Sequence, residues 1–102
     1  MPYALTMTTC ASQEEAERLA EGVITRKLAG CVQILPATSV YEWKGEICKD
    51  KEYLLLIKGT QDALPELKAY LLSEHTYELP EIVTLEITGG HERYLAWLSG
   101  QR

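Results

Sequence analysis

Two different periods govern the hydrophobic pattern of the first third of the chain. Residues 3–9 alternate between larger apolar and smaller or polar side chains, which is typical of a β-strand. Over residues 12–28 the apolar side chains return every three or four positions, which predicts an amphipathic helix. Ser12 followed by Glu15 matches the capping-box pattern, so we expect this helix to begin there.

The middle of the chain predicts a long hairpin. The segment GCVQILP is typical of a short strand, which Pro36 should end because proline cannot donate a backbone hydrogen bond. Residues 38–43 and 46–59 are rich in β-branched and aromatic side chains and flank Lys44-Gly45, which indicates a turn. The nearly continuous apolar run 53–57 indicates a strand buried on both faces.

The last part of the chain predicts a helix, a strand and a second, shorter helix. Helical spacing covers residues 60–75, with Pro65 placed where the first turn tolerates it. Alternation covers 81–88, and a short amphipathic helix covers 91–100. The complete order is β-α-β-β-α-β plus a terminal helix, which predicts a ferredoxin-like α+β fold with its helices on one face of an antiparallel sheet. We expect a single domain over residues 1–102.

Composition and charge narrow the classes of function. The net charge is −5 and no basic run is present, which argues against nucleic acid and anionic membranes as partners. No apolar run approaches the ~20 residues that span a bilayer, and the N-terminal residues lack the pattern of a signal peptide, so we expect a cytoplasmic location. The three cysteines lack the paired spacing of a zinc ribbon or a disulfide framework.

The predicted hairpin also bears on assembly. At residues 38–58 it is longer than a compact four-stranded sheet requires. Long apolar edge strands usually pair with another strand, so we expect a symmetric oligomer that covers these edges. Tyr41 and Trp43, close to the predicted turn, fit a subunit interface or the lining of a pocket.

The segment SEHTYELPEI, residues 73–82, carries the densest potential chemistry. His75 and the glutamates around it could ligate a metal ion, although a histidine in the last turn of a helix also interacts favourably with the helix dipole. Cys31 is either a small core residue or a soft ligand of the kind that suits copper or zinc. No spacing selects a cysteine–histidine or serine–histidine pair for nucleophilic catalysis, so we do not expect an enzyme.

Five segments, taken in order, resemble the signature of one known family. They are AGCVQILP, SVYEWKG, KEYLLLIKGT, HTYELPEI and GGHERYLAWL, and together they run over essentially the whole chain. Their order and spacing resemble the CutA divalent-cation tolerance proteins. Two departures stand out: Thr76 lies where members usually have proline, and Gly59 lies where they often have threonine.

The resemblance implies a fold, an assembly and a role. It implies a ferredoxin-like subunit in a tight homotrimer, with the long hairpin strands crossing subunit edges and Tyr41 and Trp43 near the interface. It further implies tolerance of copper and other divalent cations, without an established catalytic activity. The metal ligands that we expect on this basis are His75, Cys31, Glu74 and Glu78.

A second function stays open, because trimers of this family are similar in architecture to the nitrogen-regulatory PII signal proteins. In this alternative the chain is a signalling or scaffolding module whose intersubunit clefts bind a small anionic metabolite. The residues expected to line such a cleft are Lys58, Tyr77, Glu81, Tyr94 and Trp97.

Overall fold

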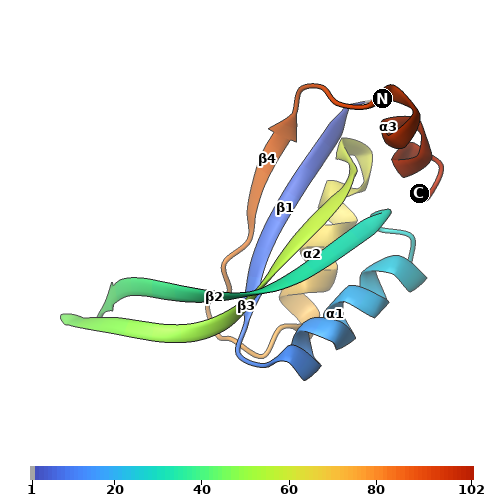
Figure 1. Cartoon of the computed structure of the whole chain (residues 1–102). Coiled ribbons are helices and arrows are strands. Elements are labelled where there is room, and N and C mark those ends of the chain that lie inside the picture. The colour runs from blue at the N-terminus through green and yellow to red at the C-terminus, as the bar shows by residue number, and fades with distance from the viewer. Residues whose placement is uncertain (1) are drawn as a thin grey trace.

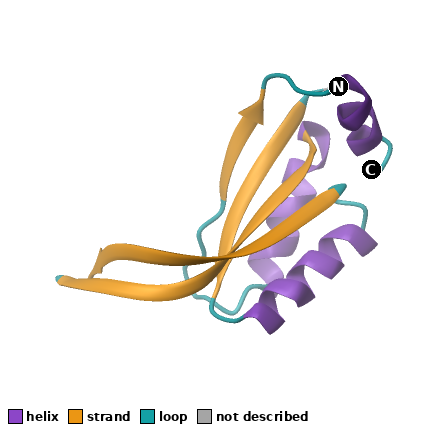
Figure 2. Ribbon diagram, in the orientation of Figure 1, coloured by secondary structure: helices purple, strands orange, loops and turns teal. Residues whose placement is uncertain are grey.

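A computed structural model describes residues 2–102, which form a four-stranded antiparallel sheet with helices packed on one face (Figures 1 and 2). The strand order is β2-β3-β1-β4, which confirms the predicted ferredoxin-like arrangement. The predicted domain begins at Met1, which lies outside the described residues. The elements are β1 Tyr3–Cys10, α1 Gln13–Thr25, β2 Cys31–Trp43, β3 Glu46–Thr60, the 3-10 turn Gln61–Ala63, α2 Leu64–Glu74, β4 Val83–Ile87 and α3 Glu92–Ser99.

The hydrophobic core lies between the sheet and the pair α1 and α2. Leu55 and Ile57 of β3 point into it and are fully buried, as are Leu19 of α1 and Leu71 of α2. Residues between them on β3, such as Leu56, point to the opposite face and are only half-buried. The prediction that β3 is buried on both faces is therefore wrong within one chain, because helices cover only one face of the sheet (Figure 1).

Both ends of α1 follow from local chemistry. At the start, the side chain of Ser12 accepts a hydrogen bond from the backbone N–H of Glu15, which is one half of the predicted capping box; the carboxylate of Glu15 accepts from Thr76 instead. The helix ends at Thr25, three residues earlier than predicted, because Lys27 takes a left-handed conformation with φ 57°. The backbone N–H of Leu28 then donates to the carbonyl of Val23, which closes a Schellman motif.

The strand β2 continues through Pro36, so the predicted end of the strand at this residue is wrong. Its only partner strand is β3, because β2 lies at the edge of the sheet. Proline is tolerated in an edge strand, since the missing N–H can lie on the open side. The hairpin then turns at Lys44 and Gly45, both with positive φ, as the sequence predicted. Figure 1 shows that its two arms project away from the rest of the chain.

The terminal helix α3 packs where β2 begins and β3 ends. Leu98 is buried there, against Gly30. A Cβ on Gly30 would lie 2.9 Å from a methyl carbon of Leu98, so a larger residue at this position would require the Leu98 side chain to shift. The contact brings the aromatic side chains of α3 close to the end of β3.

Candidate functional site

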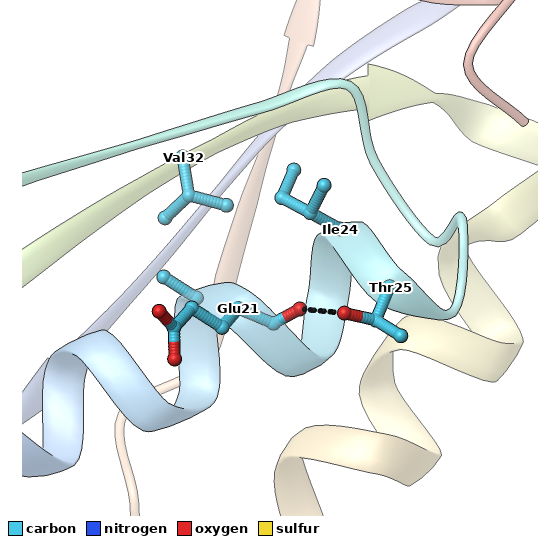
Figure 3. Close-up of a pocket in the computed structure, with 5 residues that line it drawn as sticks. Glu21, Ile24, Thr25 and Val32 are labelled. Atoms are coloured by element: carbon cyan, nitrogen blue, oxygen red, sulfur yellow. Dashed lines mark hydrogen bonds between the residues drawn. The ribbon is translucent and has the colours of Figure 1, made fainter.

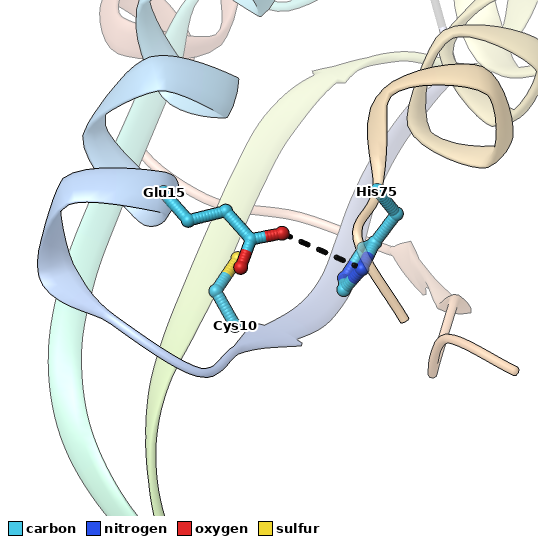
Figure 4. A group of neighbouring side chains, drawn as sticks. All are labelled: Cys10, Glu15 and His75. Carbon is cyan, nitrogen blue, oxygen red and sulfur yellow. Dashed lines mark ion pairs between the residues drawn. The ribbon is translucent and has the colours of Figure 1, made fainter. Parts of the chain in front are cut away.

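The fold brings three metal-ligating residue types together at the lower edge of the helical layer (Figure 4). Cys10 ends β1, Glu15 lies in the first turn of α1, and His75 immediately follows α2. One ligand atom from each lies within 4.8 Å of the others, and Cys10 and Glu15 are buried. These residues converge because α1 and α2 run antiparallel, so the end of α2 lies beside the start of α1.

Both ring nitrogens of His75 already have partners. Nε2 lies 2.8 Å from the backbone carbonyl oxygen of Thr9, which can only accept, so Nε2 carries the proton and donates. Nδ1 then accepts a hydrogen bond of 3.1 Å from the backbone N–H of Tyr77. The side chain of His75 has no exposed surface, and Nδ1 lies 3.7 Å from the carboxylate of Glu15. The imidazole therefore pins this turn to the end of β1.

The carboxylate of Glu15 holds the same turn from the other side. Its Oε2 accepts hydrogen bonds from the backbone N–H of Thr76 at 3.1 Å and from the Thr76 hydroxyl at 2.8 Å. Burial by itself raises the pKa of Glu15, but the two hydrogen bonds from Thr76 outweigh it and hold the pKa below its ordinary value. Burial, reinforced by the negative charge of Glu15, raises the pKa of the Cys10 thiol to about 12.

Tyr77 extends this network to the base of the hairpin. Its hydroxyl donates a hydrogen bond of 2.7 Å to the carboxylate of Glu52, a buried residue of β3. Burial and then this carboxylate raise the pKa of Tyr77, so the phenol stays protonated. His75, Thr76 and Tyr77 thus tie β1, α1 and β3 together, and we call these three residues the 75–77 latch.

The other predicted ligands do not join His75. Glu74 points to α1 and forms an ion pair of 3.3 Å with Arg18, and Glu78 is exposed and makes no hydrogen bond or ion pair within residues 2–102. Cys31 pairs with Lys58, whereas the end of β1 at Thr9 pairs with Leu54. Four residues along a strand amount to about 13 Å, so Cys31 and His75 do not share a site in one chain.

The predicted cleft residues divide into two groups. Lys58, Tyr94 and Trp97 lie together: the Lys58 ammonium is 5.8 Å from the centre of the Tyr94 ring, and the Tyr94 and Trp97 rings stack at 5.7 Å. Tyr77 belongs to the latch and bonds Glu52, six residues before Lys58 on β3, and Glu81 is exposed in the segment before β4. One chain alone therefore does not assemble the five.

Two shallow grooves accompany these clusters. The groove between α1 and β2 has a volume of ≈ 270 Å³ and is largely apolar, and the hydroxyl of Thr25 at its wall donates to the carbonyl of Glu21 (Figure 3). The other groove, of ≈ 280 Å³, lies at the base of the hairpin beside Glu52. Neither groove contains a predicted ligand.

No helix within residues 2–102 has the length and apolar character needed to cross a membrane.

Three residues of this network, Cys10, Glu15 and Glu52, were not predicted as site residues. Glu15 carries a signal only for helix capping, and Cys10 is followed by no second cysteine or histidine at a short spacing. The usable signal lies in the predicted topology: antiparallel helices on one face place the end of the second helix beside the start of the first. Applied to residues 10–15 and 75, that rule brings the three ligand types together.

Comparison with known proteins gives a consistent result. The family model described as "CutA1 divalent ion tolerance protein" matches residues 4–101. The "Divalent-cation tolerance protein CutA" of Thermus thermophilus is 44% identical over 93 residues, which cover 90% of each chain. "Protein CutA, chloroplastic" of Arabidopsis thaliana is 40% identical over 99 residues; these cover 96% of this chain but only 54% of the relative, so the chain spans about half of that longer protein.

Solved structures agree with the sequence relatives. The crystal structure of CutA1 from Oryza sativa superposes with a TM-score of 0.96 at 38% identity, over 99% of this chain and 94% of that one. The agreement includes the fold that the sequence pattern predicted. With a family match over nearly all of its residues, the chain belongs to the CutA1 divalent ion tolerance family.

Proposed function

We propose that this protein binds divalent cations, copper foremost, and thereby contributes to the cell's response to metal ion stress. The observation that carries the proposal is the convergence of a thiol, a carboxylate and an imidazole within 4.8 Å, at Cys10, Glu15 and His75. Sulfur and imidazole nitrogen are ligands that suit copper and zinc, and a carboxylate oxygen adds charge. The family name points to the same class of ligand.

The residues fit such an ion on two conditions. Nδ1 of His75 must release the N–H of Tyr77, and the Cys10 thiol must lose its proton. Both steps cost free energy, so we expect modest affinity and a local opening of the 75–77 latch. On the same strand face as Cys10, the hydroxyl of Thr8 is the one buried side-chain polar atom in residues 2–102 without a hydrogen-bond partner.

We propose binding rather than catalysis as the role of this cluster. A cysteine nucleophile requires a lowered pKa and access to a substrate. Cys10 has a raised pKa and no exposed surface. The thiol of Cys10 is therefore protonated and buried, and it is not activated as a nucleophile.

We further propose that the protein acts as a homotrimer in the cytoplasm. The sheet face without helices carries exposed apolar side chains, among them Leu35, Val83 and Leu85. The hairpin adds Trp43 and Ile47, which are 50% and 76% exposed. The two open edges, β2 and β4, differ from each other, so pairing one with the other is heterologous, the type of contact that forms a ring when the rotation between subunits closes.

Calorimetric titration of the purified protein with Cu(I), Cu(II) and Zn(II) tests the metal proposal. Cys10→Ala should weaken copper binding at least tenfold, equivalent to about 1.4 kcal/mol, whereas Cys31→Ala serves as the matched control and should not. His75→Ala should weaken it as well. Wild-type affinity no better than about 0.1 mM, near −5.5 kcal/mol, or equal affinities in the two cysteine variants, would overturn the assignment.

A second function is supported by a separate observation. Lys58, Tyr94 and Trp97 form an exposed cluster far from the metal-type residues, at the rim of the helix-free sheet face. We propose as the alternative a trimeric signalling or scaffolding module that binds a small anionic metabolite at this rim, between subunits. Retention of metabolite binding in Cys10→Ala, together with no copper binding in wild type, would favour this function over the first.

A further inference from the structure

We propose that Lys58, Tyr94 and Trp97 bind a small planar anion, a conjugated ring that carries a carboxylate or phosphate group. The inference deepens the second proposed function and rests on it, because it names the chemical class of the metabolite. It concerns the end of the sheet where β2 begins and α3 packs, opposite the 75–77 latch.

The position of Lys58 points to an anion. Its neighbours Ile57 and Gly59 are buried on the helical side, so the side chain of Lys58 extends over the helix-free face. It is half-buried, yet no carboxylate within residues 2–102 lies within 4.0 Å of its ammonium group. A cation that loses part of its hydration is stabilised by a counter-charge, and here the chain itself supplies none.

The aromatic pair beside Lys58 points to a flat ring. Tyr94 and Trp97 lie one turn apart on α3, and their rings stack with an angle of 29° between planes. Nevertheless 37% of Tyr94 and 48% of Trp97 remains exposed. Large exposed rings in register offer a surface on which a further ring can stack.

Together the two features select one class of ligand. The distance of 5.8 Å between the Lys58 ammonium and the Tyr94 ring is near the limit of a cation–π contact, so the ammonium keeps the capacity to bind an anion. A ring that stacks on this aromatic pair lies beside the Lys58 ammonium, which is 5.8 Å from the Tyr94 ring centre, so a carboxylate or phosphate on that ring can face the charge. A cationic ligand would be repelled, and an aliphatic acid would gain only the charge. One lysine in an acidic chain does not suit a polyanion such as nucleic acid.

Calorimetry on the 102-residue protein tests this class with four probes. We use 2-naphthoate and 2-naphthyl phosphate as planar anions, 2-naphthamide as the neutral ring, and cyclohexanecarboxylate as the non-planar acid. Both planar anions should bind at least tenfold more tightly than the other two probes. A preference for the carboxylate or for the phosphate identifies which anion the site takes, and either result supports the proposal.

Four variants locate the binding. Lys58→Met should weaken the planar anions about tenfold without affecting 2-naphthamide, since a charge contact of this kind contributes roughly one power of ten. Lys68→Met, on the exposed side of α2, is the matched control and should change nothing. Trp97→Leu should weaken all three naphthalene probes, and Trp97→Phe should restore most of the affinity.

Two results would overturn the inference. One is equal binding of 2-naphthoate and cyclohexanecarboxylate by wild type; the other is equal affinity for 2-naphthoate in the Lys58→Met and Lys68→Met variants. Light scattering on the same samples distinguishes a failure of this inference from a failure of the second proposed function. A trimer that ignores planar anions rejects only the ligand class, whereas a monomer rejects the intersubunit site itself.

Discussion

The contact between α1 and α2 is tightly packed at Gly22. Gly22 faces Tyr70, whose hydroxyl donates a hydrogen bond of 3.2 Å to the carbonyl of Leu19. A Cβ added at Gly22 would lie 1.8 Å from that hydroxyl oxygen. The side chain of Tyr70 is buried and cannot move aside without losing its hydrogen bond.

We therefore predict that Gly22→Ala destabilises the protein, although alanine favours helices. Overpacking costs about 1–3 kcal/mol, against a gain in helix propensity of about 1 kcal/mol. Urea unfolding should show a net loss in the free energy of unfolding. In a Tyr70→Phe background the loss should shrink, because the clashing oxygen is gone. An equal loss in both backgrounds would contradict this account.

Glu15 carries the second prediction at this scale, which concerns acid stability. The folded state holds the pKa of Glu15 below its ordinary 4.5, so on acidification the unfolded chain takes up the proton first. This contribution to the free energy of unfolding is complete above about pH 4.5 and is lost as the pH falls through the folded-state value. Glu15→Gln should be less stable than wild type at neutral pH.

The difference in the free energy of unfolding between wild type and Glu15→Gln should narrow as the solution is acidified. Urea unfolding at neutral pH and at roughly pH 3 measures it. Glu14→Gln, a change at the exposed neighbouring position, is the control and should track wild type at both values. A difference in the free energy of unfolding that stays constant with pH would mean that Glu15 acts through shape and hydrogen bonding alone.

Among the elements, α1 offers a stabilising change at its end. Lys27 is exposed and holds the left-handed position of the Schellman motif, where a Cβ costs about 1–2 kcal/mol. We predict that Lys27→Gly raises the melting temperature by roughly 4 °C or more, at a fixed protein concentration. Lys27→Ala keeps the Cβ and should bring no such gain. Equal melting temperatures for the two variants would contradict the prediction.

How far the elements could be predicted from the sequence depends on whether their ends are decided locally. The helix N-cap at Ser12 and the Lys44-Gly45 turn are local, and both predictions are confirmed. The predicted end of the strand at Pro36 was wrong because a proline ends a central strand but not an edge strand. Whether a strand lies at an edge is a property of the whole sheet. The His75 network is equally non-local, since Thr9 and Glu15 lie about sixty positions away in sequence.

Considered as a whole, the molecule has three candidate functional regions around one sheet. The 75–77 latch with its metal-type residues lies at one end, and the Lys58 cluster lies at the other. Between them stretches the helix-free face, lined with apolar side chains. A face of this composition is unfavourable in water and favours association. Assembly on it would bring neighbouring chains to the rim where Lys58 lies.

Assembly is therefore the property on which the second proposed function, binding between subunits, depends, and Leu85 tests it. Leu85 lies on the helix-free face, opposite Leu5 and 48% exposed, whereas its neighbour Glu86 points to the other side. At micromolar concentration we expect light scattering to give three times the chain mass of 11.5 kDa. Leu85→Lys buries a charge in the proposed interface and should yield monomers, while Glu86→Lys, the larger change in charge, should leave the trimer intact. Trimers in both variants would place the interface on another surface, and monomers in wild type would remove the cleft between subunits altogether.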